Sequence, residues 1–218
     1  MSDPQADASR GFLISLEGGE GAGKSTVLAA ITARLEGVGR ELVVTREPGG
    51  TPAGERIREL LLDPAQVLFA ETELLLMFAS RAQLVRETVL PALERGAIVV
   101  SDRFTDASFA YQGGGRGLDA GHIAELERWA ALVRPDLTFL LDVDVAEGLA
   151  RARARGEGAD RIESERDAFF ERVRGAYRRR AQAEPERFRV IDASQPPDRV
   201  RADVLEALEA RLAGSGLA

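Results

Sequence analysis

Five short apolar segments alternate with longer stretches of helical periodicity along the chain. Each apolar segment is hydrophobic nearly throughout, as expected for strands buried on both faces of a parallel sheet. These segments span residues 12–16, 41–45, 97–101, 137–143 and 188–191. The helical patterns between them cover residues 24–37, 53–62, 71–94, 119–133, 145–154, 163–183 and 197–212. The alternation predicts an α/β fold of three layers, with helices flanking a five-stranded parallel β-sheet.

The length of 218 residues suits one such domain. We predict a flexible N-terminal segment at residues 1–10 and a flexible tail at residues 214–218, which leaves residues 11–213 as a single domain. An Arg- and Gly-rich stretch at residues 151–161 interrupts the compact pattern. This stretch predicts a mobile lid.

Composition narrows the functional class. A formal net charge of −7 argues against nucleic acid or an anionic membrane as the main partner, because both attract basic surfaces. The chain has no cysteine and a single histidine, His122, which excludes disulfides, thiolate metal sites and a histidine zinc cluster. No apolar run approaches the ~18 residues of a membrane span. These features predict a cytoplasmic protein without a membrane segment.

A phosphate-binding loop follows the first apolar segment directly. Its residues are Gly18-Gly19-Glu20-Gly21-Ala22-Gly23-Lys24-Ser25, which match G-x-x-x-x-G-K-[ST] at every fixed position. The glycines let backbone N–H groups face one centre, the following helix adds its positive N-terminus, Lys24 supplies a charge and Ser25 offers a hydroxyl to Mg²⁺. The sequence therefore predicts a P-loop that binds a nucleotide polyphosphate.

The second predicted strand ends in Thr45-Arg46-Glu47-Pro48-Gly49-Gly50-Thr51. Ligands of open parallel sheets collect at the carboxyl ends of the strands, so this loop faces the same crevice as the P-loop. Arg46 can neutralise an anionic acceptor, Glu47 can orient it, and Pro48 fixes the turn. An ordinary β-turn explains the loop equally well. Arg58 is either a second phosphate clamp or a solvated helix charge.

Arg81 falls on the apolar face of its predicted helix, together with Leu74, Met77, Phe78 and Val85. A guanidinium in that position needs a partner. A nucleobase that stacks on Met77 or Phe78 and offers a carbonyl to Arg81 would provide one. A buried carboxylate paired with Arg81 would serve as well, with Met77 and Phe78 in the core.

The third predicted strand delivers Asp102 and Arg103 to the same crevice. Asp102 is placed like the carboxylate that supports Mg²⁺ in P-loop enzymes, and Arg103 would reach the phosphates. Further along, Ser108, Tyr111 and Gln112 are one helical turn apart and share a face.

These residues resemble those of bacterial thymidylate kinases from about Gly11 to Ser194. The resemblance is carried by the 18–25 loop with an acid at Glu20, the 46–51 loop, Arg81, Asp102-Arg103-Phe104, the 111–115 segment and the arginine-rich lid. It implies a P-loop nucleoside-monophosphate kinase, assembled as a homodimer. The reaction implied is transfer of the γ-phosphoryl group of Mg·ATP to dTMP, giving dTDP.

At the donor end, the resemblance implies that Lys24, Thr26 and the loop amides hold ATP, while Ser25 and Asp102 hold Mg²⁺. Arg151 would cover adenine, and Ala193 would lie beside it through backbone atoms. Because Glu20 occupies the loop position where some relatives carry an arginine, Arg153 or Arg155 of the lid would supply the transition-state charge.

At the acceptor end, the resemblance implies that Arg46, Arg58 and Arg103 bind the dTMP phosphate, with Glu20 and Glu47 organising them. Arg81 would address thymine O4, Ser108 and Gln112 the polar edge of the ring, and Tyr111 would crowd the sugar 2′ position. Relatives often have Phe four residues before the arginine, where this chain has Met77, so either Met77 or Phe78 stacks on the base.

Two alternatives remain from the sequence. Another P-loop nucleotide or nucleoside kinase would share the loop and the lid. A regulatory GTPase would share the loop alone, but such proteins read guanine with an Asn-Lys-x-Asp segment, which the chain lacks.

Overall fold

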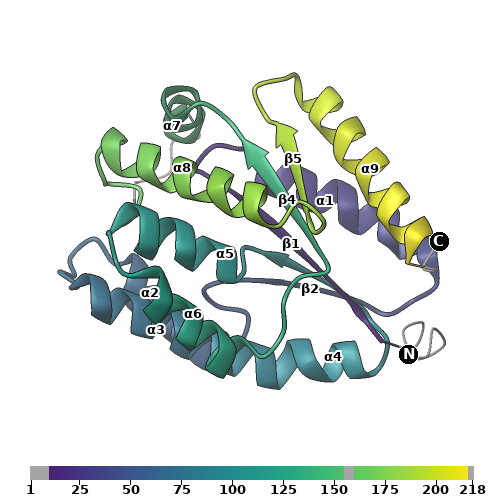
Figure 1. Cartoon of the computed structure of the whole chain (residues 1–218), viewed down its shortest axis with the longest axis horizontal. Coiled ribbons are helices and arrows are strands. Elements are labelled where there is room, and N and C mark those ends of the chain that lie inside the picture. The colour runs from purple at the N-terminus through teal and green to yellow at the C-terminus, as the bar shows by residue number, and fades with distance from the viewer. Residues whose placement is uncertain (1–9, 155–159, 216–218) are drawn as a thin grey trace.

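One parallel sheet of five strands forms the centre of the molecule (Figure 1). The computed structural model describes residues 10–154 and 160–215. The strands are β1 (Phe12–Gly18), β2 (Leu42–Arg46), β3 (Ile98–Asp102), β4 (Leu137–Asp142) and β5 (Phe188–Asp192). They follow the order β2-β3-β1-β4-β5, and every neighbouring pair is parallel. The predicted α/β fold and sheet are therefore confirmed.

The sheet register brings three strand ends to one edge. Asp102 pairs with Leu16 on one side and with Arg46 on the other. β1 lies between β3 and β4, so the strand order reverses at β1. In open parallel sheets, ligands usually bind in the crevice at the carboxyl ends of the strands where the order reverses.

Two helices, α1 (Lys24–Leu35) and α9 (Pro197–Gly214), cover one face of the sheet (Figure 1). Alternate strand residues such as Ile14 and Val100 pack there against Ile31 and Leu208, all at most 1% exposed. The period-2 alternation of strands and the 3.6-residue period of helices produce this matched apolar layer.

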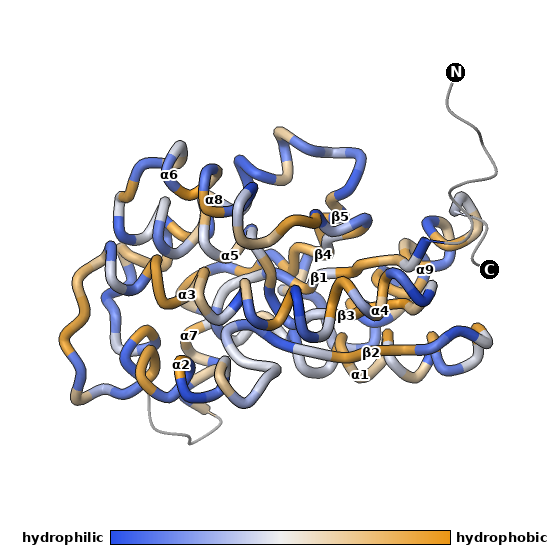
Figure 2. Tube along the Cα trace, turned by 90° about the horizontal axis from the view of Figure 1, so that it is seen from below, coloured by the Kyte–Doolittle hydropathy of each residue, from blue (hydrophilic) through white to orange (hydrophobic). Residues whose placement is uncertain are grey.

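The opposite face is covered by the remaining long helices. Near β1 and β3, α3 (Ala70–Leu84) is followed by a π-helical turn, η2 (Val85–Val89), and by α4 (Leu90–Glu94). Helix α5 (Thr105–Ser108) contacts β1 and leads into the π-helical segment η3 (Phe109–Gly115), which packs on α8 (Asp167–Ala183); α8 in turn contacts β4 and β5. The other elements are η1 (Glu36–Val38), α2 (Pro52–Leu62), α6 (Ala120–Leu126), η4 (Glu127–Ala131) and α7 (Val145–Ala154). Figure 2 shows hydrophobic segments along the strands and hydrophilic ones on outer loops.

Three predicted helices differ in detail from the structure. The 71–94 helix contains the π-helical turn η2 just before Pro91, whose ring excludes normal α-helical bonding to the preceding turn. The 119–133 helix ends at Leu132, which has a left-handed φ of 60°. The 163–183 helix begins only at Asp167, because Asp160 accepts hydrogen bonds from the backbone of Ile162 and Glu163 and holds a turn there.

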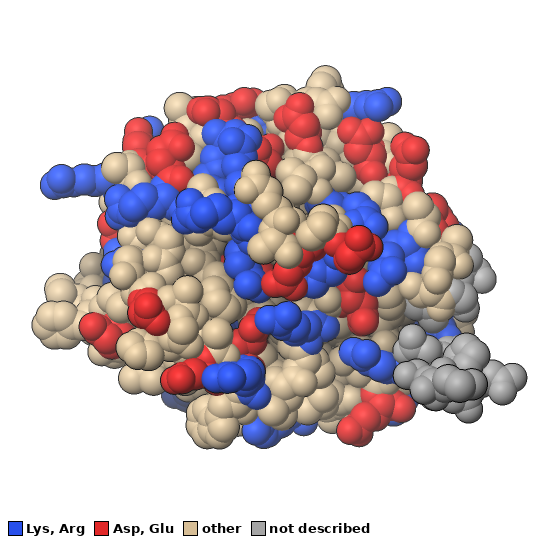
Figure 3. Space-filling model, in the orientation of Figure 1, with Lys and Arg blue, Asp and Glu red and all other residues tan. Residues whose placement is uncertain are grey.

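The surface mixes both signs of charge. Acidic and basic side chains are interspersed on the face of the molecule drawn in Figure 3. His122 is exposed, as the sequence predicted. Across residues 10–154 and 160–215, no helix combines the length and the apolar character needed to cross a membrane.

Candidate active site

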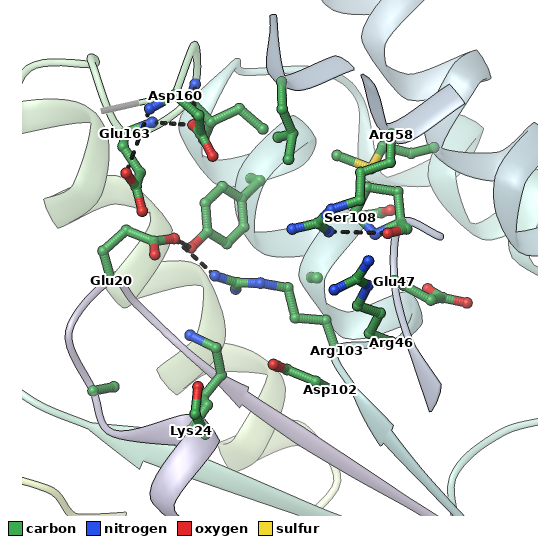
Figure 4. Close-up of a pocket in the computed structure, with 18 of the residues that line it drawn as sticks. Glu20, Lys24, Arg46, Glu47, Arg58, Asp102, Arg103, Ser108, Asp160 and Glu163 are labelled. Carbon is green, nitrogen blue, oxygen red and sulfur yellow. Dashed lines mark hydrogen bonds and ion pairs between the residues drawn. The ribbon is translucent and has the colours of Figure 1, made fainter. Parts of the chain in front are cut away.

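A cavity of about 590 Å³ opens at the carboxyl ends of β1, β2 and β3 (Figure 4). It brings together most of the residues that the sequence singled out. Its lining includes residues 20–26, 46–48, Arg58, Met77, Arg81, Asp102, Arg103, Ser108, Tyr111 and Gln112. Donor-side and acceptor-side candidates therefore share one cavity.

The P-loop forms the floor at the end of β1. Gly21 and Gly23 adopt left-handed φ values of 68° and 90°, which side chains rarely allow. The Nζ of Lys24 donates to the carbonyls of Gly18, at 3.2 Å, and Gly19, at 2.9 Å. Burial, and then the positive charge of Arg103, lower the pKa of Lys24. The ammonium thus lies over the loop in a position to meet a phosphate.

The backbone of the loop approaches the backbone of helix α7 closely. A Cβ added to Gly21 would lie 1.9 Å from the carbonyl oxygen of Gly148, and one added to Gly148 would lie 2.5 Å from that of Glu20. A glycine at each of these two positions permits the approach. The P-loop and the helix that leads to the predicted lid are consequently in direct contact.

Arg103 connects the loop with the acceptor side of the cavity. It has a left-handed φ of 69°, and its guanidinium donates to the Glu20 carboxylate at 2.7 Å and to the Gly18 carbonyl at 2.9 Å. Tyr111 donates its hydroxyl to Glu20 at 2.9 Å and lies 4.8 Å beneath the Arg103 guanidinium. Burial alone would lower the pKa of Arg103, but Tyr111 and Glu20 help to hold it well above its ordinary value.

A second layer supports Arg103 from below. Tyr177 lies 3.4 Å from Arg103 and donates its hydroxyl to Glu17 at 2.7 Å. Glu17 is fully buried, and burial, together with the charge of Asp106, raises its pKa to about 8. Glu17 was not predicted as a site residue, because a glutamate inside an apolar strand belongs to no motif.

Asp102 is the last residue of β3, and one of its carboxylate oxygens has no hydrogen-bond partner among the described residues. Its Oδ1 is buried, and it accepts no hydrogen bond from any described residue. Ser25, at the start of α1, is exposed and lines the same cavity. Within the described part of the chain, no group of three or more histidine or acidic side chains lies close enough to cage a metal.

The end of β2 and helix α2 each supply a further cation. Arg46 pairs with Glu55 at 2.9 Å, and Arg58 of α2 donates to the Pro48 carbonyl at 3.0 Å. Burial lowers the pKa of Arg58, and the charge of Arg46 adds to this effect. Arg46, Arg58 and Arg103 all border the cavity, so three guanidiniums surround one space (Figure 4).

Arg81 has both the buried partner and the cavity position considered from the sequence. It is 2% exposed, and its Nε donates to Glu47 at 2.7 Å. It also donates to the Ser108 hydroxyl at 3.0 Å and the Phe104 carbonyl at 3.2 Å. Burial raises the pKa of Glu47, whereas Arg81 opposes the rise. The structural ion pair therefore forms part of the cavity wall.

The two candidates for stacking on a base point in different directions. Met77 lines the cavity. Phe78 is 2% exposed and packs in a core cluster with Leu74, Ile123 and Ala130, with its ring 4.4 Å from the Arg81 guanidinium. Met77 is thus the residue of the pair that a ligand in the cavity would meet.

The residues of the predicted lid separate into distinct places. Arg151, on α7, donates to the Ala193 carbonyl at 2.7 Å, so these two candidates lie together, beside the loop after β5. Arg153 is exposed near the end of α7. Arg155 lies outside the described residues. Arg161, which the sequence placed with the lid arginines, donates a hydrogen bond to Glu73 at 2.7 Å.

Sequence reasoning missed five residues that line the cavity. They are Leu62, Ala107, Asp160, Ile162 and Glu163. The last three come from the end of the predicted lid and the residues directly after it, where Asp160 and Glu163 stand opposite Glu20 (Figure 4). Asp160 falls within the predicted lid and Glu163 lies just beyond it, but neither matches a motif that fixes where this part of the chain runs.

Comparisons with known proteins agree on one family. The family model described as thymidylate kinase matches residues 16–204. A thymidylate kinase of Pseudomonas putida is 54% identical over 205 residues, covering 93% of this chain and 97% of the relative. One from Alkalilimnicola ehrlichii is 56% identical over 201 residues, covering 91% and 93%. The crystal structure of the Ehrlichia chaffeensis thymidylate kinase superposes with a TM-score of 0.76 at 32% identity, covering 92% of this chain and 99% of that one.

Proposed function

The chain belongs to the thymidylate kinase family, and we propose that its P-loop cavity is where it transfers the γ-phosphoryl group of ATP to dTMP. The protein is a nucleoside-monophosphate kinase, so the products are dTDP and ADP. One observation carries the assignment of the cavity: Arg103 contacts the P-loop at Gly18 and Glu20 while facing the space bordered by Arg46 and Arg58. A single space thus serves the donor and the acceptor phosphates.

At the donor end, Lys24 and the loop amides hold the phosphates of ATP. Asp102 and Ser25 fit a Mg²⁺ ion, because Asp102 offers a buried carboxylate oxygen without a hydrogen bond and Ser25 an exposed hydroxyl. Mg²⁺ commonly binds proteins through one or two such groups plus substrate phosphates. When bound, it neutralises charge on the transferring phosphoryl group.

At the acceptor end, three guanidiniums hold the dTMP phosphate: Arg46, Arg58 and Arg103. Glu20 fixes Arg103, and Glu47 fixes Arg81, so both arginines are held before substrate arrives. Pre-positioned charges stabilise a transition state without reorganisation at the moment of reaction.

The base lies deeper, against Met77, with Arg81, Ser108 and Gln112 at its polar edge. Tyr111 stands beside the sugar and leaves no room for a 2′ hydroxyl. Its hydroxyl is fixed by Glu20, which supports a rigid wall at that position. A ribonucleotide is therefore a poorer acceptor than its deoxy form.

The lid completes the reaction. Arg151 covers adenine next to the Ala193 backbone, and Arg153 or Arg155 brings a positive charge to the γ-phosphoryl group. Such an arginine contributes about 10³- to 10⁵-fold in rate in related phosphoryl transfers. Closure of the lid also keeps water from accepting the phosphoryl group.

The enzyme works as a homodimer in the cytoplasm. An apolar face on α3 and η4 supports the dimer, because Leu75 and Trp129 are 58% and 72% exposed and border a shallow hollow there with Leu74 and Leu126. Large exposed apolar patches mark interaction sites. Light scattering should give a dimer for the native chain and a monomer for Trp129→Glu; a dimeric variant would move the interface elsewhere.

A coupled ADP-release assay across monophosphates tests the activity. With Mg·ATP, kcat/KM should be highest for dTMP, lower for dUMP, dCMP and dGMP, and negligible for thymidine, which lacks the accepting phosphate. Highest kcat/KM with thymidine or dCMP would point to another nucleoside or nucleotide kinase.

A further inference from the structure

A buried glutamate lies behind the base end of the cavity. Glu73, in the first turn of α3, is 1% exposed and is not among the residues that line the cavity. The side-chain amide of Gln112 donates from Nε2 to Glu73 Oε1 at 2.8 Å. Gln112 does line the cavity, so Glu73 holds it from the far side.

Two arginines keep this carboxylate charged. Arg116, the residue directly after η3, pairs with Glu73 at 3.0 Å, and Arg161 pairs with it at 2.7 Å. Burial would raise the pKa of Glu73, but Arg116, Gln112 and Arg161 together hold it below its ordinary value. An ionised carboxylate only accepts hydrogen bonds.

The consequence for Gln112 follows from the two poles of an amide. Its NH₂ group must face Glu73, since a carboxylate has no proton to give to the amide oxygen. The carbonyl oxygen is the pole left for the cavity. Nearby, Ser108 accepts from Arg81 and keeps its hydroxyl proton to donate. The base therefore meets an acceptor at Gln112 beside a donor at Ser108.

We propose that Glu73 is a positioning residue for base selectivity, because it locks Gln112 with its amide oxygen toward the substrate. This inference rests on the proposed function. Thymine offers an N–H next to a carbonyl oxygen and matches the locked pair. Cytosine offers a ring nitrogen without a proton next to an amino group. Its ring nitrogen, an acceptor, would face the acceptor oxygen of Gln112, and its amino group, a donor, would face the donor hydroxyl of Ser108.

The substitution Glu73→Gln tests the lock with little change of shape. A glutamine at this position can donate as well as accept, so Gln112 is free to turn. We expect the ratio of kcat/KM for dTMP over dCMP to fall at least about tenfold, since sites built around hydrogen bonds reject mismatched analogues strongly. A merely structural role would lower both values by the same factor and leave the ratio unchanged, which would overturn the proposal.

Glu165→Gln is the matched control. Glu165 pairs with Arg116 in the same cluster, and among the hydrogen bonds of the described residues Gln112 bonds to Glu73 and not to Glu165. This variant should keep the native ratio, and circular dichroism of both variants should show the native fold. If native protein itself fails to phosphorylate dTMP, the proposed function fails; native turnover with an unchanged ratio in Glu73→Gln refutes the lock alone.

A measurement on the native chain covers the case in which Glu73→Gln does not fold. In NMR spectra of ¹⁵N-labelled protein saturated with dTMP, the Gln112 NH₂ protons should show NOEs to the Glu73 side chain. NOEs from these protons to the thymine ring would mean that the amide faces the other way, and would refute the inference.

Discussion

Removing Arg81 should destabilise the fold as well as weaken dTMP binding. Arg81 and Glu47 lie 2.7 Å apart, with side chains only 2% and 3% exposed. Breaking a buried pair by deleting one partner costs about 3–5 kcal/mol, because the other charge is left uncompensated. For a domain of this size each kcal/mol lowers Tm by about 2–4 °C, so Arg81→Ala should melt about 6–20 °C below the native chain.

The deficit should depend on pH. Burial already raises the pKa of Glu47 against the pull of Arg81, and without Arg81 the rise is larger. The folded state then keeps a proton that the unfolded state has released, so stability falls as pH rises above the ordinary value of 4.5. Arg81→Ala should therefore lose less stability at about pH 5.5 than at about pH 8.

Urea unfolding followed by circular dichroism measures both effects. The double variant Arg81→Ala/Glu47→Gln removes the stranded charge and should recover part of the loss and most of the pH dependence. Calorimetric titration with dTMP on the folded fraction should show weaker binding for Arg81→Ala. Equal losses in the single and double variants, at both pH values, would refute the buried-pair reasoning.

Three further outcomes are expected. Gly21→Ala should lose at least about 1–2 kcal/mol of unfolding free energy in urea, because the φ of Gly21 is 68° and the added Cβ would meet Gly148. Gly19→Ala, whose added Cβ would have nothing within 4 Å, should keep the native stability, and equal effects of the two variants would contradict this. Glu17→Gln should flatten the fall in stability that the buried acid causes between pH 4.5 and about 8, and an unchanged profile would place that proton elsewhere. Arg155→Ala should lower kcat far more than it weakens dTMP binding, by about 10³-fold or more, and matched losses in both would remove its transition-state role.

The strands and the P-loop were predictable because their signals are local. The runs at residues 12–16 and 97–101 are apolar except for Ser15 and Ser101, so they could be recognised as strands without deciding which face is buried. Each strand lies within two residues of its predicted bounds. The P-loop motif fixes its own backbone through glycines. The strand ends then placed Asp102 and Arg103 at the crevice without further information.

The sequence did not predict which way a side chain faces when this depends on how its helix packs, or on partners far away in the chain. Met77 and Phe78 are neighbours on α3, and only the packing of the helix decides that Met77 faces the cavity and Phe78 the core. From the sequence alone, Glu73 is an acid in the first turn of a helix, where acids are common because they interact favourably with the helix dipole. In the structure it is buried and paired with Arg116 and Arg161. Those partners lie 43 and 88 positions away in the chain, where periodicity carries no signal.

The bonds from Arg103 to Gly18 and Glu20 matter for inhibitor design. In the arrangement that we propose, a compound that fills only the nucleoside-monophosphate half would contact the same guanidinium that donates hydrogen bonds to the P-loop. Its affinity would then change with the occupancy of the neighbouring subsite. Screening such compounds both with and without nucleotide triphosphate would separate the two rankings.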